Sequence, residues 1–165
     1  MSFFAFSAKI CRGQEISVSA SATLKNASFE SPFEFDYRVE NLRRYLQKYD
    51  SPLAAYAQDF VSYADENGLD YRLVASISGV ESTFGKHIPF KSFNAYGWAN
   101  GKYGFKSWPN SIEIVSVTLR KEYIEKGAPT IKKIARRYAP PSATWGGKVK
   151  YFEGKIDTLP LSFDI

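Results

Sequence analysis

The sequence predicts an all-α domain (α+β at most) of about six helices, and three observations lead to this class. From residue 36 onward, apolar side chains recur three or four positions apart, which is the period of a helix with one buried face. Asp, Ser, Thr, Pro and Gly residues stand where such helices would begin and end. At 165 residues and 44% hydrophobic content, the chain is long enough to bury a core as one domain.

The first 35 residues differ in pattern from the rest of the chain. Residues 15–25 alternate apolar and small polar side chains, which is the period of a strand or of an extended arm. A single strand is not stable alone and needs something to pair with or lie on. We therefore expect an extended N-terminal arm over residues 1–35, a helical domain over residues 36–158 and a C-terminal tail over residues 159–165.

The first three helices are each expected from a start signal. One begins at Asp36, and the second begins at the Ser-Pro pair at 51–52 and stops at the Asn-Gly pair at 67–68. The third covers residues 70–85, with Asp70 as its N-cap. The inward stripes of the first two are Val39, Leu42, Leu46 and Tyr49, and then Leu53, Tyr56, Phe60 and Tyr63.

Three more helices are expected in the second half. Asn110 or Ser111 caps the fourth, which ends at Gly127, and the Pro-Thr pair at 129–130 opens a short fifth. The Pro-Pro pair at 140–141 breaks the chain before the last helix. Their inward stripes are Ile112, Val115, Leu119 and Tyr123, then Ile131, Ile134 and Tyr138, then Trp145, Val149, Phe152 and Ile156.

The leading candidate for chemistry is Glu81, near the end of the third helix. Val74, Ile77 and Glu81 fall at i, i+3 and i+7, on one face that should point into the core. The carboxyl group would then emerge at the edge of apolar packing, where partial desolvation disfavours the anion and suits a general acid working near neutral pH. An ordinary residue at a helix end is the alternative for an isolated Glu.

The stretch after Glu81 favours the catalytic alternative. Residues 82–112 contain no Asp or Glu but hold four lysines, four glycines and eight aromatic residues. Flat aromatic faces beside a lone proton donor are what a groove that cleaves sugars needs, and an exposed aromatic patch usually marks a binding site. Core packing is the alternative for each ring. The eight aromatic residues are Phe84, Phe90, Phe93, Tyr96, Trp98, Tyr103, Phe105 and Trp108.

Composition narrows the partners and cofactors. The net charge of +5 favours a polyanionic partner, which could be nucleic acid, acidic lipid or an anionic cell-wall polymer. Cys11 is the only cysteine and His87 the only histidine, so we expect no metal site and no cofactor. No segment approaches the ~20 apolar residues of a membrane span, and no export signal is evident at the N-terminus.

Four segments follow one another in an order that resembles a known family. Residues 75–85 place an acid before a serine and an aromatic residue, and residues 92–98 read Ser-Phe-Asn-Ala-Tyr-Gly-Trp. Residues 105–108 read Phe-Lys-Ser-Trp ahead of a helix, and residues 138–145 open with Tyr-Ala. In this order the segments resemble glycoside hydrolase family 73, the bacterial autolysin and flagellar endo-β-N-acetylglucosaminidases of the lysozyme-like superfamily.

This resemblance implies a lysozyme-like fold and cleavage of peptidoglycan or a related N-acetylated polysaccharide, outside the cell or in its envelope. It makes Glu81 the general acid and Tyr138 a hydroxyl of the catalytic centre, although Tyr138 lies at i+4 from Ile134 and suits the core equally well. Nucleic acid is not expected as a partner, since a carboxylate repels phosphate. The expected substrate-binding residues are Ser82, Phe84, Asn94, Tyr96, Gly97, Trp98, Tyr103 and Trp108.

Several alternatives stay open at this stage. Glycosidases usually use two carboxylates about 5–10 Å apart, and the acid-free stretch cannot supply the second. The substrate's 2-acetamido group could act as nucleophile, or its 6-hydroxyl could close an anhydro ring as in lytic transglycosylases. The family's Tyr-Ala-Thr-Asp is Tyr-Ala-Pro-Pro here. A glycan-binding module without catalysis and a nucleic-acid-binding protein are the rivals from other classes. A second acid would have to come from Asp65, Glu66, Glu113 or the N-terminal arm.

Overall fold

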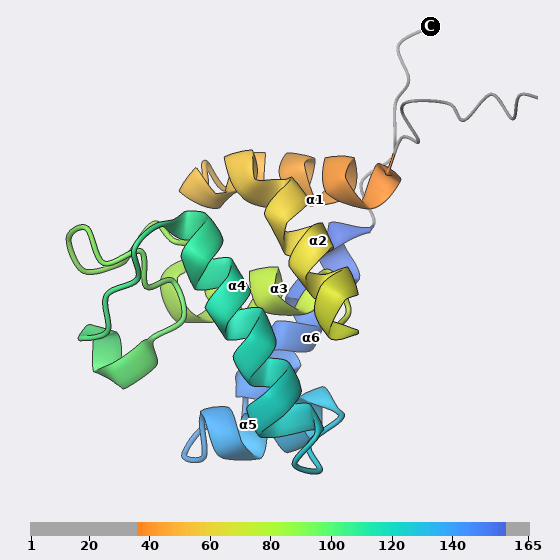
Figure 1. The fold of residues 1–165 in the computed structure, drawn as a ribbon, viewed down its shortest axis with the longest axis vertical. Helices are drawn as coiled ribbons and strands as arrows, with labels where there is room; N and C mark the ends of the chain where they lie inside the picture. Colours follow the sequence, from red (N-terminus) through yellow and green to blue (C-terminus); the bar gives the residue numbers. More distant parts are fainter. Residues whose placement is uncertain (1–35, 158–165) are drawn as a thin grey trace, which may run out of the picture. The chain divides into compact units, whose positions relative to one another are not determined.

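The computed structural model describes residues 36–157, and these form six α-helices with no β-strand among them. The predicted all-α class is therefore confirmed (Figure 1). The expected arm over residues 1–35 and the tail over residues 159–165 lie outside the described residues. The helices are α1 (Tyr37–Gln47), α2 (Ala57–Asn67), α3 (Leu73–Ser82), α4 (Trp108–Thr118), α5 (Ile131–Tyr138) and α6 (Trp145–Ile156).

Most of the predicted helix boundaries are found where the capping residues stand. The Asp36 carboxylate accepts the N–H of Arg38 at 2.9 Å and opens α1. The Ser51 hydroxyl accepts the N–H of Leu53 and opens a 3-10 turn, Pro52–Tyr56, that leads into α2. Gly68 ends α2 in the left-handed conformation, with φ 58°. The Thr130 hydroxyl caps α5.

Two helices differ from their predicted extents. The third helix was expected over residues 70–85, but α3 begins at Leu73 and ends at Ser82. It stops because Thr83, Phe84 and the following Gly85 all have positive φ, between 53° and 80°, which a right-handed helix cannot include. The fourth helix begins earlier than expected, at Trp108, because the Ser107 hydroxyl accepts the N–H of Asn110.

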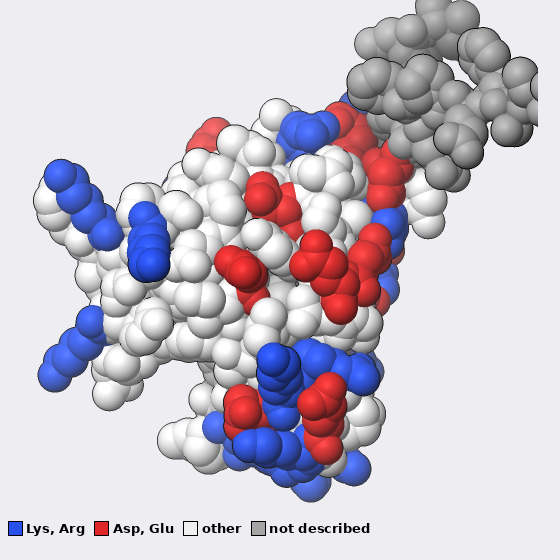
Figure 2. Space-filling model, viewed as in Figure 1, with Lys and Arg blue, Asp and Glu red and all other residues white. Residues whose placement is uncertain are grey.

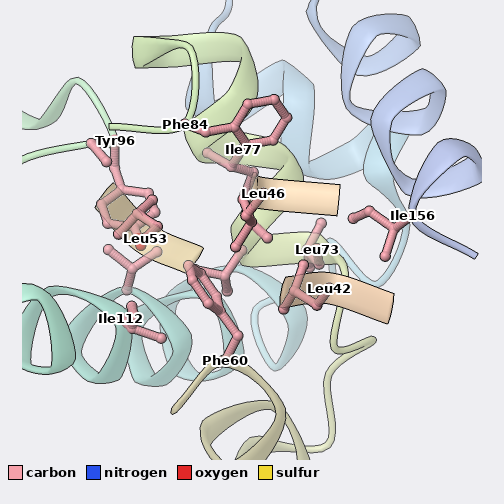
Figure 3. Packing of buried hydrophobic residues seen from close by; sticks show 14 of the residues in the cluster. Leu42, Leu46, Leu53, Phe60, Leu73, Ile77, Phe84, Tyr96, Ile112 and Ile156 are labelled. Carbon is pink, nitrogen blue, oxygen red and sulfur yellow. The ribbon is translucent and has the colours of Figure 1, made fainter. Parts of the chain in front are cut away.

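Helix α3 forms the centre of the core, and every residue from Leu73 to Gly79 is buried. It packs against α6 on one side and α4 on the other, while α2 packs on α4 and α5 packs on α6. Figure 3 shows side chains of α1, α3 and α4 meeting in this core. Since α3 is buried along its length, the carboxylate near its end comes to the surface directly from the core. The labelled residues of Figure 3 include Leu42, Leu46, Ile77, Phe84 and Ile112.

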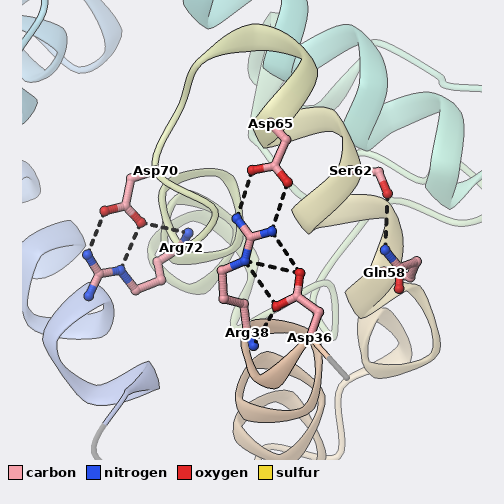
Figure 4. Close-up of polar contacts among 7 residues, drawn as sticks. All are labelled: Asp36, Arg38, Gln58, Ser62, Asp65, Asp70 and Arg72. Atoms are coloured by element: carbon pink, nitrogen blue, oxygen red, sulfur yellow. Dashed lines mark hydrogen bonds and ion pairs between the residues drawn. The ribbon is translucent and has the colours of Figure 1, made fainter. Parts of the chain in front are cut away.

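An ion-pair cluster joins the start of α1 to the end of α2. Arg38 contacts both oxygens of Asp65 at 2.8 Å and one oxygen of Asp36 at 2.7 Å, as drawn in Figure 4. The hydrogen bond to Arg38 lowers the pKa of both aspartates. This cluster lies away from Glu81 and serves the fold.

Between α3 and α4 the chain runs through residues 83–107 without an α-helix, and a 3-10 turn, Trp98–Gly101, is its main local structure. A π-helical segment, Leu119–Ile124, continues α4. Both segments border the candidate site described below. Within residues 36–157, every helix is too short or too polar to span a bilayer.

Candidate active site

The Glu81 carboxylate lies in the last turn of α3, half-buried, with its two oxygens in different surroundings. Oε1 accepts a hydrogen bond from the indole Nε1–H of Trp145 at 2.6 Å. Trp145 is buried at the start of α6, 64 residues further along the chain. The packing of α6 on α3 therefore fixes the orientation of this carboxylate.

Gly97 brings the backbone of the irregular loop against the second oxygen. Its φ is +68°, and a Cβ atom built at this position would lie 2.8 Å from Oε2 of Glu81. Only glycine combines that backbone conformation with so close an approach at little strain. The contact of Gly97 with substrate that the sequence suggests stays a prediction, and the structure adds a close approach of its backbone to Glu81.

The Tyr138 hydroxyl joins the loop to the end of α5. It donates to the backbone carbonyl of Tyr96 at 2.7 Å and accepts from the indole Nε1–H of Trp98 at 3.2 Å. Burial, followed by the charge of Glu81, raises the pKa of Tyr138 well above its usual value, so the hydroxyl keeps its proton at neutral pH. Its ring stacks on the Trp145 ring with centroids 4.9 Å apart. In this arrangement Tyr138 positions the loop and the tryptophan; the catalytic role predicted for its hydroxyl stays a prediction.

These residues border an open pocket of about 590 Å³. Its size falls within the range usual for ligand sites. Glu81 is the only carboxylate among the described residues that line it, and no lysine or arginine lines it. Of the candidates for a second acid, Asp65, Glu66 and Glu113 are outside this lining, and the N-terminal arm lies outside the described residues. The pocket is lined by Glu81, Tyr96, Gly97, Trp98, Ala99, Asn100, Tyr103, Thr118, Tyr123, Tyr138 and Ala139.

Trp98 and Tyr103, two aromatic residues of the loop, line this pocket, and their predicted contact with substrate stays a prediction. Their ring centroids lie 5.9 Å apart in an edge-to-face arrangement, and Tyr103 is 43% exposed. The ring of the buried Phe105 packs against both, with its centroid 5.4 Å from that of Trp98 and 4.7 Å from that of Tyr103. The two rings are therefore held in place by the core and remain open to solvent on the pocket side.

Asn94 and Ser82 were expected to bind substrate, and the structure gives them another role. The Asn94 amide donates to the carbonyls of Trp98 and Tyr103 and accepts from the N–H groups of Tyr96 and Trp98. The Ser82 hydroxyl bonds the carbonyl of Ala95 at 2.9 Å. Both side chains are buried. Their polar atoms bond backbone groups of the loop that have no partner in a helix or strand, and this stabilises the loop.

Phe84 and Trp108 were also expected in the groove, and this prediction is wrong. Phe84 is fully buried in an edge-to-face cluster with Tyr45 and Phe152. Trp108 is buried at the start of α4 and packs against Phe93, with centroids 5.3 Å apart. Large aromatic side chains are stabilised by burial in the core, and these two are buried there and do not line the pocket.

Tyr96 is only partly as predicted. Its ring is fully buried in the core, while its backbone borders the pocket and accepts the hydrogen bond from Tyr138. Burial also raises the pKa of the Tyr96 phenol. The residue therefore anchors the loop from the core, and its predicted contact with substrate stays a prediction.

Sequence reasoning missed six residues of this site, which are Trp145 and five of the pocket lining: Ala99, Asn100, Thr118, Tyr123 and Ala139. Trp145 and Tyr123 were both assigned to inward helical stripes, which describes their burial but not their position beside Glu81. Tyr123 comes from the π-helical segment, and its ring centroid lies 6.1 Å from that of Tyr138. For Trp145, the one available signal was its place at the first turn of a helix, directly after the Pro-Pro break.

Four lysines lie in the irregular loop close to the candidate site in sequence, and all four are exposed. Figure 2 shows basic side chains standing apart over this loop, at the left of the view. Basic and acidic side chains lie together at the bottom of the view. Such a distribution suits a broad attraction to an anionic polymer more than a single tight anion site. In residues 36–157, no three His, Cys, Asp or Glu side chains are grouped so that they could hold a metal ion. The lysines are Lys86, Lys91, Lys102 and Lys106.

The sequence was compared with protein-family models and with curated proteins, and neither comparison found a relative. No protein-family model matches the chain, and no curated protein matches it. The resemblance to a family of glycosidases therefore depends on the four segments of the sequence and stays a prediction.

Proposed function

We propose that this protein cleaves the glycan strands of bacterial peptidoglycan as an endo-β-N-acetylglucosaminidase-like glycosidase with a lysozyme-like fold. One observation carries the proposal: a half-buried carboxylate, held by an indole N–H, lies at the edge of a pocket bordered by aromatic rings. Such a protein would act outside the cytoplasmic membrane, where its substrate is.

The two oxygens of Glu81 suit a proton donor. Because Oε1 already accepts the Trp145 N–H, the proton of the acid form belongs on Oε2, beside Gly97. From there it would pass to the bridging oxygen of the glycosidic bond as the bond from that oxygen to the anomeric carbon breaks. Trp98 and Tyr103 would stack against the C–H faces of the neighbouring sugars.

The pocket favours a mechanism that needs a single carboxylate from the protein. Among the described residues that line it, Glu81 is the only acid, and this supports a route in which the substrate itself supplies the nucleophile. The positive charge that develops at the anomeric carbon would be met by the substrate, either by its 2-acetamido oxygen or by its 6-hydroxyl. The first route gives a reducing end after hydrolysis. In the second, Glu81 takes up the proton of the 6-hydroxyl as the anhydro ring closes, which is the reaction of a lytic transglycosylase. A lytic transglycosylase or a muramidase of the same superfamily is the alternative activity.

Replacement of Glu81 by Gln tests the proposal. The amide keeps the size of the side chain but cannot supply the proton, so release of soluble fragments from purified sacculi should fall by about 10²–10⁴-fold. The matched control is Glu113→Gln, an exposed glutamate of α4 outside the pocket, which should leave the rate unchanged. Equal rates for Glu81→Gln and the parent protein, with both variants folded, would contradict the mechanism.

Mass spectrometry of the fragments identifies the bond and the chemistry together. A reducing N-acetylglucosamine end supports the glucosaminidase, and an anhydro-muramyl end supports the transglycosylase. A reducing N-acetylmuramic acid end supports the muramidase. If the parent protein sediments with sacculi but releases no new glycan end, the chain is a glycan-binding module and the enzymatic proposal fails.

A further inference from the structure

A second cavity, of about 640 Å³, lies between α5 and the start of α6. The segment of residues 138–141 separates it from the pocket at Glu81: Tyr138 and Ala139 border that pocket, while Pro140 and Pro141 border this cavity. The proposed function makes no use of it. Its lining consists of Thr130, Ile131, Lys132, Ala135, Arg136, Pro140, Pro141, Ser142, Ala143, Gly146, Gly147 and Lys150.

Part of the lining of this cavity is apolar and formed by small or rigid residues, beside the polar Thr130 and Ser142 and three long cationic side chains. At Gly146 the two helices come close together, since a Cβ there would lie 3.3 Å from the Cβ of Ala135 and 3.7 Å from Cγ2 of Ile131. Pro140 and Pro141 complete the apolar lining without offering a backbone N–H. No aromatic ring of residues 36–157 lines the cavity, so this part of the chain does not offer it the flat faces that favour a sugar.

The charges that line the cavity are all positive. Lys132 and Arg136 lie one turn apart on α5, and Lys150 belongs to α6. All three are exposed, and Lys132 and Arg136 form no ion pair with a carboxylate of the described part of the chain. Lys150 has an acid near it, Glu153, but no Asp or Glu is part of the lining. The cavity therefore combines an apolar wall with a one-sided positive charge.

We propose that this cavity binds a short acidic peptide, with the peptide's carboxylates at the three cations and its small apolar side chains against the proline and alanine wall. The inference rests on the proposed function in one respect: the peptide would be the one attached to the glycan strand under cleavage. A phosphate polymer would use the charge but gain nothing from the apolar wall, and a bare glycan would gain nothing from the charge.

The position of the cavity fits such a use. The chain leaves the pocket at Ala139, forms the proline wall, and returns at Trp145, whose indole holds Glu81. A strand that presents one sugar to Glu81 could place an attached peptide on the far side of this short segment. Occupation of the cavity would then select peptide-bearing glycan over bare glycan.

Calorimetric titration of the full chain tests peptide binding directly. The probe is the tetrapeptide Ala-Glu-Ala-Ala with a free carboxyl terminus, and its neutral counterpart carries Gln in place of Glu and an amidated terminus. We expect the acidic peptide to bind at least about tenfold more tightly, because a charge-assisted hydrogen bond contributes on the order of that factor. Equal binding of the two peptides would overturn the proposal.

Two adjacent lysines of α5 supply a matched pair of variants. Lys132→Glu reverses a charge in the cavity, whereas Lys133→Glu makes the same change at an exposed neighbour outside it. The first should weaken peptide binding at least about tenfold and the second less than twofold. Equal weakening by both would show attraction to net charge alone. Tighter binding of a glycerol-phosphate oligomer than of the peptide would also refute the assignment.

The two proposals fail separately. Glu81→Gln should retain the peptide affinity of the parent protein, so peptide binding without any cleavage of sacculi would overturn the proposed function alone. Cleavage without peptide binding would overturn the cavity assignment alone. If both hold, Lys132→Glu should slow cleavage of peptide-bearing strands and leave that of amidase-stripped strands unchanged, and Lys133→Glu should change neither.

Discussion

The close contact between Gly97 and Glu81 leads to the most informative perturbation of this protein. In Gly97→Ala, a Cβ atom would have to occupy a point 2.8 Å from Oε2 of Glu81, while the backbone keeps a φ of +68°. A carbon and an oxygen that are not bonded prefer a separation of roughly 3.4 Å. The carboxylate must therefore move by about 0.6 Å, or the loop must move away from it.

The size of the effect differs between stability and activity. The left-handed backbone conformation costs alanine about 1–2 kcal/mol, which should appear as a loss of unfolding free energy. The displaced carboxylate should also lengthen its 2.6 Å hydrogen bond to Trp145. Because misplacing a catalytic group by about 1 Å costs on the order of 10²-fold in rate, we expect glycan cleavage to fall by roughly 10- to 100-fold.

Gly127→Ala is the matched control. Gly127 has a φ of +88°, and a Cβ atom there would meet nothing within 4 Å. It should lose a similar amount of stability, measured by denaturant unfolding, but keep the parental cleavage rate. The indole N–H resonance of Trp145, identified by its loss in Trp145→Phe, should shift in Gly97→Ala and stay in place in Gly127→Ala. Equal rates and equal resonances in the two variants would refute the positioning of Glu81 by Gly97.

Three further predictions concern single side chains. Trp145→Phe keeps a ring against its neighbours but removes the N–H that Glu81 accepts, so the rate of cleavage should fall about 10-fold or more. The free energy of unfolding should fall by about 1–2 kcal/mol. Burial, and then the charge of Asp70, raise the pKa of Glu153 from 4.5 to about 7. The native state then binds more protons than the unfolded state between these values, so stability should fall as pH rises from 4.5 to 7. Glu153→Gln should remove this fall and raise the unfolding free energy at pH 8 by about 1–2 kcal/mol in denaturant titrations. Arg38→Met should destabilise the fold by about 1 kcal/mol at pH 7, a loss that disappears as pH falls through the lowered pKa values of its two aspartate partners, and unfolding at pH 7 and pH 2 measures this.

The helices and their ends were largely predictable from local chemistry. The residues that begin or end a helix act on backbone groups only a few positions away, so the neighbouring sequence is enough to predict them. Such residues are Asp36, Ser51, Gly68 and Thr130. The prediction was wrong at the end of α3, where Thr83 adopts a left-handed conformation that its residue type does not announce.

The site was predictable only in part, because burial of a ring in an irregular segment follows no period. Trp98 and Phe84 stand in the same acid-free stretch, yet one borders the pocket and the other fills the core. Position in the sequence does not distinguish them. The irregular segment is held by Asn94, which was predicted to bind substrate and whose amide instead bonds the backbone of the loop.

Local sequence placed Glu81 at the end of a buried helix, since the 3.6-residue period and the acid-free stretch are properties of neighbouring residues. Tertiary packing alone brought Trp145 to that carboxylate across 64 residues and placed Gly97 against its other oxygen. The reason is that a hydrogen bond between distant segments depends on how two helices pack, and packing depends on the complementary shapes of whole faces. Those shapes are not encoded by any short run of residues.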